Sequence, residues 1–157
     1  MKPKLVFERI SEKNFEVFIQ LIRELAKYER LEGPDAQATE RLKQDGLSDS
    51  PKYEAYIGNL NGVPIAYLIY FMTYSTFLAL PTLYVEDIFI LEEHRRKGFG
   101  QQILNFCVKQ AKAQNCGRVE WAVLTWNEPA IKFYEKNDAH RLGWYFYRLT
   151  RDDFLRF

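Results

Sequence analysis

A short basic segment with two glycines carries the clearest chemical signal in this sequence. It lies between an alternating apolar run at 83–91 and a helical pattern at 101–115. Glycines let a ligand come close to the backbone, the first amides of a helix have no partner within the helix, and adjacent cations raise the local potential. The segment therefore predicts a site for a diphosphate or a similar anion. Its residues are Arg95, Arg96, Lys97, Gly98, Phe99 and Gly100.

Three kinds of phosphate-binding loop compete for this segment. A dinucleotide-binding fingerprint would need a third glycine where Ile103 stands, and a nucleoside-triphosphate loop would need a Gly-Lys-Ser/Thr ending that is absent here. The pattern Arg-x-x-Gly-x-Gly instead resembles the signature with which Gcn5-related N-acetyltransferases, the GNAT superfamily, hold the pyrophosphate of acetyl-coenzyme A. The alternative interpretation is an exposed turn between a strand and a helix that binds no ligand.

Length and charge limit the class of protein that this chain can form. Its 157 residues favour a single domain covering 1–157, and 22 basic against 21 acidic residues give no indication of a nucleic-acid or anionic-membrane partner. No apolar stretch approaches the roughly 20 residues that a membrane helix needs. The charged start at 1–4 is unlike a leader, and Cys107 and Cys116 have no disulfide or metal-ligand spacing. We therefore expect a cytoplasmic protein without a metal.

Periodicity and turn residues predict an α+β fold. Helices are expected from a Ser11 cap to about 28, from a Thr39 cap to 46, from 98 to 115, and from an Asn127 cap onward. Strands are expected at 5–9, from 52, at 65–72, at 83–90, at 118–124 and at 144–150, with a tight hairpin turn at Asn61-Gly62. This order indicates a mixed, mostly antiparallel sheet, in which one parallel βαβ unit places a ligand loop at the carboxyl end of a strand.

A tyrosine on the helix that follows Asn127 is a candidate proton donor. Tyr134 lies seven residues after Asn127, which is about two helical turns, so the two residues share a helix face. A departing thiolate needs a proton, and a phenol with a pKa near 10 can supply it. The alternative is that Tyr134 is a core aromatic beside Phe133.

Two adjacent carboxylates, Glu86 and Asp87, interrupt the apolar run that leads to the basic segment. Alternation along a strand would place one of them on each face of the sheet. Such a carboxylate could attract an alkylammonium group and relay its proton to water, or it could simply lie at a solvated edge or in an ion pair. Tyr28 and Glu29, at the end of the first helix, are either substrate contacts or only a helix end. Cys107 is expected in the core, and the alternative is a covalent route through an acyl-cysteine.

Four sequence blocks together resemble the spermidine/spermine N-acetyltransferase branch of the GNAT superfamily, which includes the thialysine N-acetyltransferases. They occur in family order and at family spacing, and they cover nearly the whole chain. The blocks are 25–29, which reads Leu-Ala-Lys-Tyr-Glu; 84–90, which reads Tyr-Val-Glu-Asp-Ile-Phe-Ile; the segment 95–100; and Trp126 to Pro129 with Phe133 and Tyr134.

This resemblance implies acetyl-coenzyme A as the co-substrate, a homodimer, and a role for each matching residue. The tyrosine matching Tyr134 is the general acid, and the glutamate matching Glu86 handles the proton of the amine. The positions of Tyr28, Glu29 and Asp87 lie near the substrate. Cofactor contacts are implied for the backbone of Ile88, Phe89 and Ile90, for the pyrophosphate-binding stretch Arg95, Arg96, Lys97, Gly98, Phe99, Gly100 and Gln101, and for Asn127, Glu128, Pro129 and Ala130.

The chain departs from the family pattern at three places that bear on the substrate. Polyamine-specific members carry an aspartate after the tyrosine that matches Tyr74, whereas Ser75 stands here, as in thialysine-type sequences. A glycine after the tyrosine helix is replaced by Asn137-Asp138, which can still adopt a left-handed cap. The connection 139–143 is shorter than in relatives.

These features predict direct transfer of an acetyl group from acetyl-coenzyme A to a primary amine of a small molecule, such as a lysine analogue, a diamine or a polyamine. Juxtaposition of the two reactants would supply much of the catalysis, so no nucleophile need appear in the sequence. Two alternatives stay open: acetylation of protein lysines or N-termini, and a non-catalytic sensor of acyl-coenzyme A on the same scaffold.

Overall fold

The computed structural model describes residues 3–157, which form two compact units. The first ends at Ala122 and holds the whole sheet, and the second runs from Val123 to Phe157. The expectation of one domain over 1–157 stays a prediction. None of the helices among the described residues is long and apolar enough to cross a membrane.

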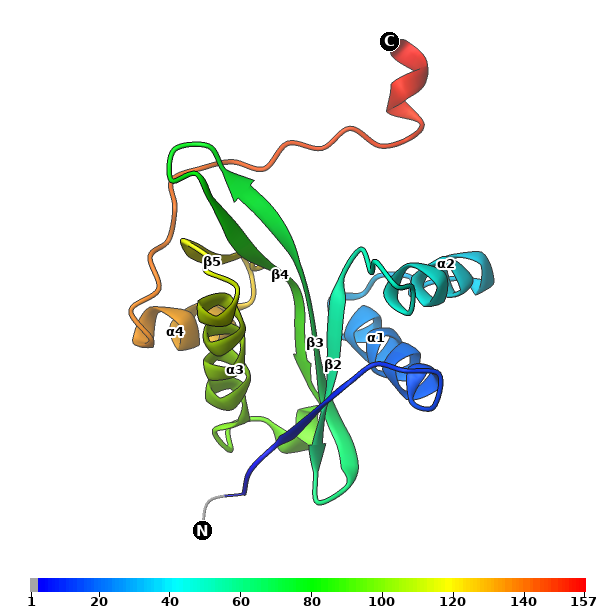
Figure 1. Ribbon diagram of the computed structural model, residues 1–157, viewed down its shortest axis with the longest axis vertical. Helices are drawn as coiled ribbons and strands as arrows, with labels where there is room; N and C mark the ends of the chain where they lie inside the picture. The colour runs from blue at the N-terminus through cyan, green and yellow to red at the C-terminus, as the bar shows by residue number, and fades with distance from the viewer. Residues whose placement is uncertain (1–2) are drawn as a thin grey trace. The chain divides into compact units, whose positions relative to one another are not determined.

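The first unit is built on one five-stranded sheet with the order β1-β2-β3-β4-β5 (Figure 1). Neighbouring strands are antiparallel except for β4 and β5, which are parallel. The sequence prediction of a mixed, mostly antiparallel sheet with one βαβ unit is therefore confirmed. The strands are β1 (Val6–Arg9), β2 (Glu54–Leu60), β3 (Val63–Ser75), β4 (Leu80–Ile90) and β5 (Arg118–Trp121).

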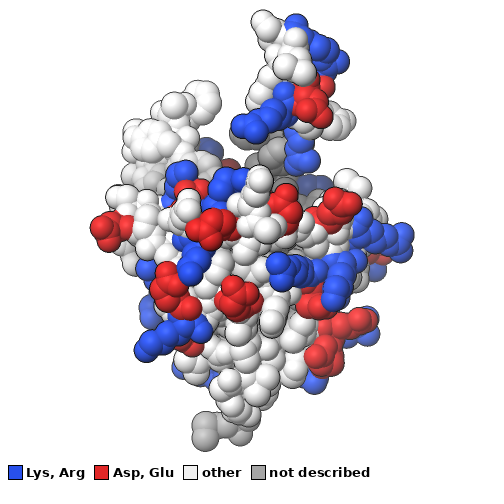
Figure 2. All heavy atoms as spheres, turned by 90° about the vertical axis from the view of Figure 1, so that its right-hand side faces the viewer, with Lys and Arg blue, Asp and Glu red and all other residues white. Residues whose placement is uncertain are grey.

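Helices cover both faces of this sheet. In Figure 1, α1 (Phe15–Glu29) and α2 (Ala36–Gly46) lie on one side and α3 (Phe99–Ala113) lies on the other. Side chains of β3 alternate between the two cores, with Tyr67 packed in the cluster of α1 and Leu68 in the cluster of α3. Over α1 and α2, cationic and anionic side chains are interspersed (Figure 2).

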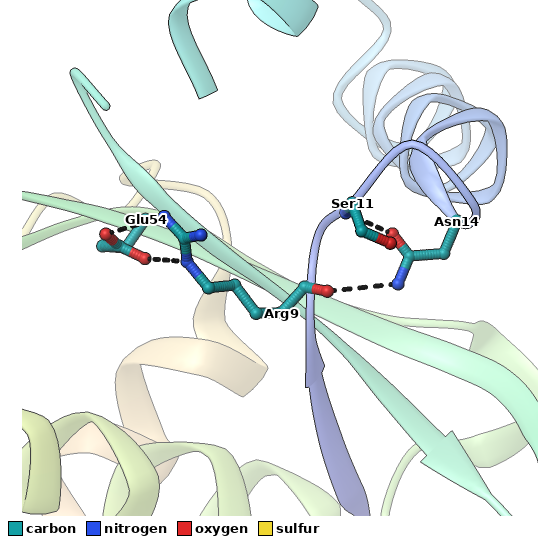
Figure 3. Close-up of polar contacts among 4 residues, drawn as sticks. All are labelled: Arg9, Ser11, Asn14 and Glu54. Carbon is teal, nitrogen blue, oxygen red and sulfur yellow. Dashed lines mark hydrogen bonds and ion pairs between the residues drawn. The ribbon is translucent and has the colours of Figure 1, made fainter. Parts of the chain in front are cut away.

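The first helix begins later than the sequence predicts. Asn14, and not Ser11, is its N-cap residue, and α1 begins at Phe15. The Asn14 side chain bonds backward: its Oδ1 accepts from the Ser11 N–H at 2.8 Å, and its Nδ2 donates to the Arg9 carbonyl at 3.2 Å (Figure 3). Arg9 also forms a two-point ion pair with Glu54 on β2, at 2.6 and 3.1 Å. These bonds hold the turn that connects β1 to α1.

The second helix begins earlier than predicted, because its cap is Asp35 and not Thr39. The Asp35 Oδ1 accepts from the Ala38 N–H at 2.7 Å, which satisfies one of the helix's first amides. The hairpin prediction is confirmed: Asn61 and Gly62 connect β2 to β3 with φ values of 52° and 81°, as a type I′ turn requires.

The strand predicted at 144–150 is wrong, because this segment has no secondary structure. Alternating aromatic residues favour extended backbone, but a strand also needs a neighbour with which to exchange hydrogen bonds. Within the second unit the structure describes only helical elements, α4 (Glu128–Lys136) and a short 3₁₀ helix, η2 (Asp153–Arg156). Trp144 and Tyr147 are accordingly 75% and 92% exposed. The strand expected at 118–124 also ends early, at Trp121.

Candidate active site

Strand β4 is bulged at the position of its two carboxylates. Its register with β3 pairs Ile69 with Asp87 and then Tyr70 with Val85, so Glu86 is an extra residue without a partner on β3. Val85 packs in the core beneath α3, whereas Phe89 packs in the core beneath α1. The simple alternation that the sequence predicts is thus interrupted at Glu86, and Asp87 follows on the α1 side of the sheet.

Asp87 is partly buried and bonded to a tyrosine from the neighbouring strand. The Tyr67 hydroxyl donates to the Asp87 Oδ2 at 3.1 Å, and Tyr67 is 0% exposed. Burial raises the pKa of Asp87 to about 6, repulsion from Glu86 and Glu29 adds to this rise, and the Tyr67 hydrogen bond opposes it. Burial and the Asp87 charge raise the pKa of Tyr67, so its hydroxyl remains a donor at physiological pH.

The end of α1 brings a third carboxylate to this place. The helix ends at Glu29, and Arg30 follows with a left-handed φ of 58°. Glu29 is partly buried, and burial raises its pKa. Its charge acts on both Asp87 and Tyr67, so the predicted substrate residues from α1 and β4 are brought together. Three carboxylates in one place form a suitable environment for an ammonium group.

Arg95 connects the basic segment to this acidic site. Its guanidinium lies over the Tyr28 ring, at 4.4 Å from the ring centroid, and 5.4 Å from the centroid of Phe89. Its Nε donates to the Ile90 carbonyl at 2.8 Å. These contacts hold the side chain against α1 and β4, and the contact with the cofactor expected of Arg95 stays a prediction. No motif or periodicity in the sequence indicates the contact between Arg95 and Tyr28.

The rest of the basic segment has the geometry of an anion-binding turn. It follows β4 and the short 3₁₀ helix η1 (Glu92–His94), β4 runs parallel to β5, and Gly98 is the N-cap of α3. Arg96 and Gly98 have positive φ values of 59° and 84°. Arg96, Lys97 and Gly98 are exposed, whereas Phe99 is buried in the core beneath α3. The first amides of α3 and two exposed cations are therefore available to a phosphate.

The second unit contains the predicted proton donor on α4. Asn127 is the N-cap, as predicted, and its Oδ1 accepts from the Ala130 N–H at 3.4 Å, with Pro129 in the first turn. The Tyr134 ring lies 5.3 Å from the Phe133 ring. Asp138 adopts the left-handed conformation that the sequence allowed, with a φ of 58°. The role of Tyr134 stays a prediction.

Two further observations concern groups that could act in other mechanisms. Cys107 is buried in the α3 core, as predicted, and burial raises its pKa to about 12, which disfavours the nucleophilic thiolate. Over residues 3–157, the structure brings together no set of three or more His, Cys, Asp or Glu residues that could hold a metal ion.

Comparison with known proteins now identifies the class. The model of the Acetyltransferase (GNAT) family matches residues 18–138. A solved structure of a possible acetyltransferase from Clostridium difficile 630 superimposes with a TM-score of 0.80 at 17% identity, covering 94% of this chain and 97% of that chain. The chain belongs to the GNAT family of acetyltransferases.

Curated relatives point to one branch of this family. The chain is 42% identical over 116 residues to an L-ornithine N5-acetyltransferase of Arabidopsis thaliana, covering 72% of this chain and 51% of the relative, which is about half of its length. It is 31% identical over 142 residues to a thialysine N-epsilon-acetyltransferase of Bos taurus, covering 83% of each chain. The protein is thus an acetyl-coenzyme A-dependent N-acetyltransferase, and its acceptor has to be argued from the site.

Proposed function

We propose that this protein transfers the acetyl group of acetyl-coenzyme A to a primary amine of a small diamine or diamino acid, such as ornithine or a lysine analogue. The observation that carries the proposal is the gathering of Glu29, Glu86 and Asp87 beside β4. An ammonium group is the ligand that such a set of carboxylates favours. The relatives named for ornithine and thialysine support the same substrate class.

The cofactor would lie along the end of β4 and the segment that follows it. In this proposal the backbone of 88–90 contacts the pantetheine, and the exposed turn at 95–101 binds the pyrophosphate through the first amides of α3. Residues 127–130 contact the cofactor as the resemblance implies. A β4 backbone amide stabilises the oxyanion that forms when the thioester carbonyl is attacked.

The reaction is a direct transfer. A protonated amine loses two protons on its way to an amide, one before its nitrogen can attack and one from the tetrahedral intermediate. One proton goes to the departing thiolate of coenzyme A, from Tyr134 in this proposal, and the other goes to solvent. The resemblance assigns the proton of the amine to Glu86.

The choice among amines depends on how many cationic groups the site can hold. Ser75 stands where polyamine-specific relatives carry an aspartate, and its Oγ accepts from the Leu78 N–H at 3.3 Å, so it serves the local turn. A long polycation would therefore lack one anchoring charge, and we propose that spermidine and spermine are poorer acceptors than short diamines.

A coenzyme A release assay tests this function. Ornithine, lysine, thialysine, putrescine, spermidine, spermine and lysine-containing peptides are compared by kcat/KM. We expect the diamino acids or short diamines to exceed spermine by about tenfold or more, the scale of one lost ion pair in a partly desolvated site. A preference for peptides would instead support protein acetylation, and binding of acetyl-coenzyme A without turnover of any amine would support a sensor.

We also propose that the protein is a cytoplasmic homodimer. The resemblance implies the dimer, and the exposed aromatic residues at 144–147 are consistent with a surface that is covered in an assembly. Light scattering coupled to gel filtration measures the mass directly, and a monomer at micromolar concentration would contradict this proposal.

A further inference from the structure

Two carboxylates compete for the first proton of the substrate amine, and they differ in their surroundings. Glu86 is exposed at the bulge of β4 and has no partner on β3. Asp87 is partly buried and accepts a hydrogen bond from the fully buried Tyr67. A proton acceptor works best when its geometry is held and its proton affinity lies near the working pH, which favours the enclosed carboxylate over the exposed one.

The bond from Tyr67 also fixes which oxygen is available. It engages the Oδ2 of Asp87, so Oδ1 takes no part in this bond. Because Tyr67 is held in the α1 core by edge-to-face contact with Phe18, at 5.6 Å between ring centroids, its hydroxyl is a rigid anchor. Asp87 is thus held in one orientation beside the segment 88–90 that is proposed to meet the pantetheine.

Titratable groups from β3, from β4 itself and from the end of α1 act on Asp87. Strand β3 contributes a neutral hydroxyl, and the bulge of β4 and the end of α1 contribute one carboxylate each. The guanidinium of Arg95, which follows η1 (Glu92–His94), lies over the adjacent rings of α1 and β4. The two carboxylates attract an ammonium and raise the pKa of Asp87 together with burial, while the hydroxyl lowers it. The groups that act on Asp87 are Tyr67, Glu86 and Glu29, while the Arg95 guanidinium is held over the rings of Tyr28 and Phe89.

We propose that Asp87, oriented by Tyr67, is the catalytic residue that accepts the first proton from the substrate ammonium. The N–H bond breaks, its electron pair stays on nitrogen as the attacking lone pair, and the carboxylate becomes a carboxylic acid that later releases the proton to water. The lone pair attacks the thioester carbonyl and forms the N–C bond, and the tetrahedral intermediate loses its second amine proton to solvent. Collapse of this intermediate breaks the C–S bond, and the departing thiolate is protonated. Glu86 contributes to attraction of the cation. This inference rests on the proposed acetyl transfer to an amine.

Asp87→Asn is the main test, because asparagine keeps the shape and can still accept from Tyr67. In the wild type, we expect kcat/KM for the amine to fall as the pH drops through about 6, where Asp87 becomes protonated. Asp87→Asn should lower kcat/KM by about 100-fold or more at neutral pH. It should also abolish the fall in kcat/KM at acidic pH, which is the acid limb of the pH profile. With a fluorinated acceptor whose amine is neutral at pH 7, Asp87→Asn should lower kcat/KM by only about tenfold or less, since no first proton has to be removed.

Tyr67→Phe tests the positioning role. Removing the hydroxyl takes away the bond that lowers the pKa of Asp87, so the acid limb should move to higher pH while most of the activity at high pH remains. A merely structural role of Tyr67 would lower activity at all pH values and leave the limb in place.

Glu86→Gln is the matched comparison, and it should raise KM for the amine but keep the acid limb. Circular dichroism and the thermal shift with acetyl-coenzyme A verify the fold of each variant. If the limb survives in Asp87→Asn and disappears in Glu86→Gln, Glu86 is the acceptor and this inference is wrong. If the wild type releases no coenzyme A with any amine, the proposed function itself fails, and the two failures are thereby distinguished.

Discussion

At the scale of single residues, Asp87 combines a proposed catalytic role with a cost in stability. Its pKa is raised in the folded protein from 3.8 to about 6. Between these two pH values the folded state binds more protons than the unfolded state, so this group makes the protein less stable as the pH rises through the interval. The cost is fully present above about pH 6 and absent at acidic pH.

Asp87→Asn should therefore raise the free energy of unfolding at about pH 8, by about 1–3 kcal/mol, with the lower part of that range favoured because the carboxylate is partly exposed. At about pH 4 the same variant should differ little from the wild type. Urea unfolding at the two pH values measures both differences. A variant that is less stable than the wild type at pH 8 would contradict the raised pKa.

Tyr134 is the proposed donor of a proton to the departing thiolate of coenzyme A. Tyr134→Phe should lower kcat by about 100-fold or more and leave the affinity for acetyl-coenzyme A nearly unchanged, because only a proton transfer is removed. Tyr145→Phe is the matched control, since Tyr145 lies in the same unit and is 87% exposed. Steady-state kinetics over a pH series provides the measurement, and an unchanged kcat would show that water or another group is the acid.

At the scale of elements, the end of α1 is coupled to the segment that follows β4. The Arg95 guanidinium lies over Tyr28 on α1 and over Phe89 on β4, and its Nε is bonded to the Ile90 carbonyl. Such cation–π contacts are worth roughly 0.5–2 kcal/mol each. Arg95 thus supports the position of Tyr28 and the neighbouring Glu29 relative to β4.

Arg95→Gln should raise KM for the amine about twofold to thirtyfold, the range that loss of one cation–π contact corresponds to, with a smaller change for acetyl-coenzyme A. Arg96→Gln is the matched comparison, because Arg96 is exposed in the same segment and should affect acetyl-coenzyme A instead. Initial-rate kinetics with each substrate varied in turn separates the two. Equal effects of both variants on both substrates would remove the distinction between the two arginines.

At the scale of the whole molecule, acetyl-coenzyme A should stabilise the folded protein by mass action. A Cβ at Gly98 would meet no atom within 4 Å, but the φ of 84° is one that valine rarely adopts. Gly98→Val should therefore cost about 1–2 kcal/mol in unfolding free energy and also lose most of the thermal shift with the cofactor, because the side chain occupies space next to the pyrophosphate. Gly143→Val is the control, since its Cβ also meets nothing and its φ is not positive. A full thermal shift in Gly98→Val would contradict the assignment of the pyrophosphate site.

Local sequence determined those features whose causes lie within a few residues. Asn61-Gly62 has the left-handed conformations of a tight hairpin, Asn127 caps its helix, and the glycine-bearing segment leads from β4 into α3. Each depends on backbone preference or on a bond between near neighbours, so the residue types suffice to predict it. The GNAT fold could be recognised because four such blocks occur in family order and at family spacing.

Only the tertiary structure decided which distant residues meet. The bulge at Glu86 turns Asp87 toward α1, the Tyr67 hydroxyl reaches it from β3, and Arg95 lies over Tyr28. None of these contacts follows from periodicity, because each depends on strand register and on the packing of elements far apart in the chain. The same reason explains the error at 144–150, where the local pattern favours a strand but pairing requires a neighbouring strand that the second unit does not supply.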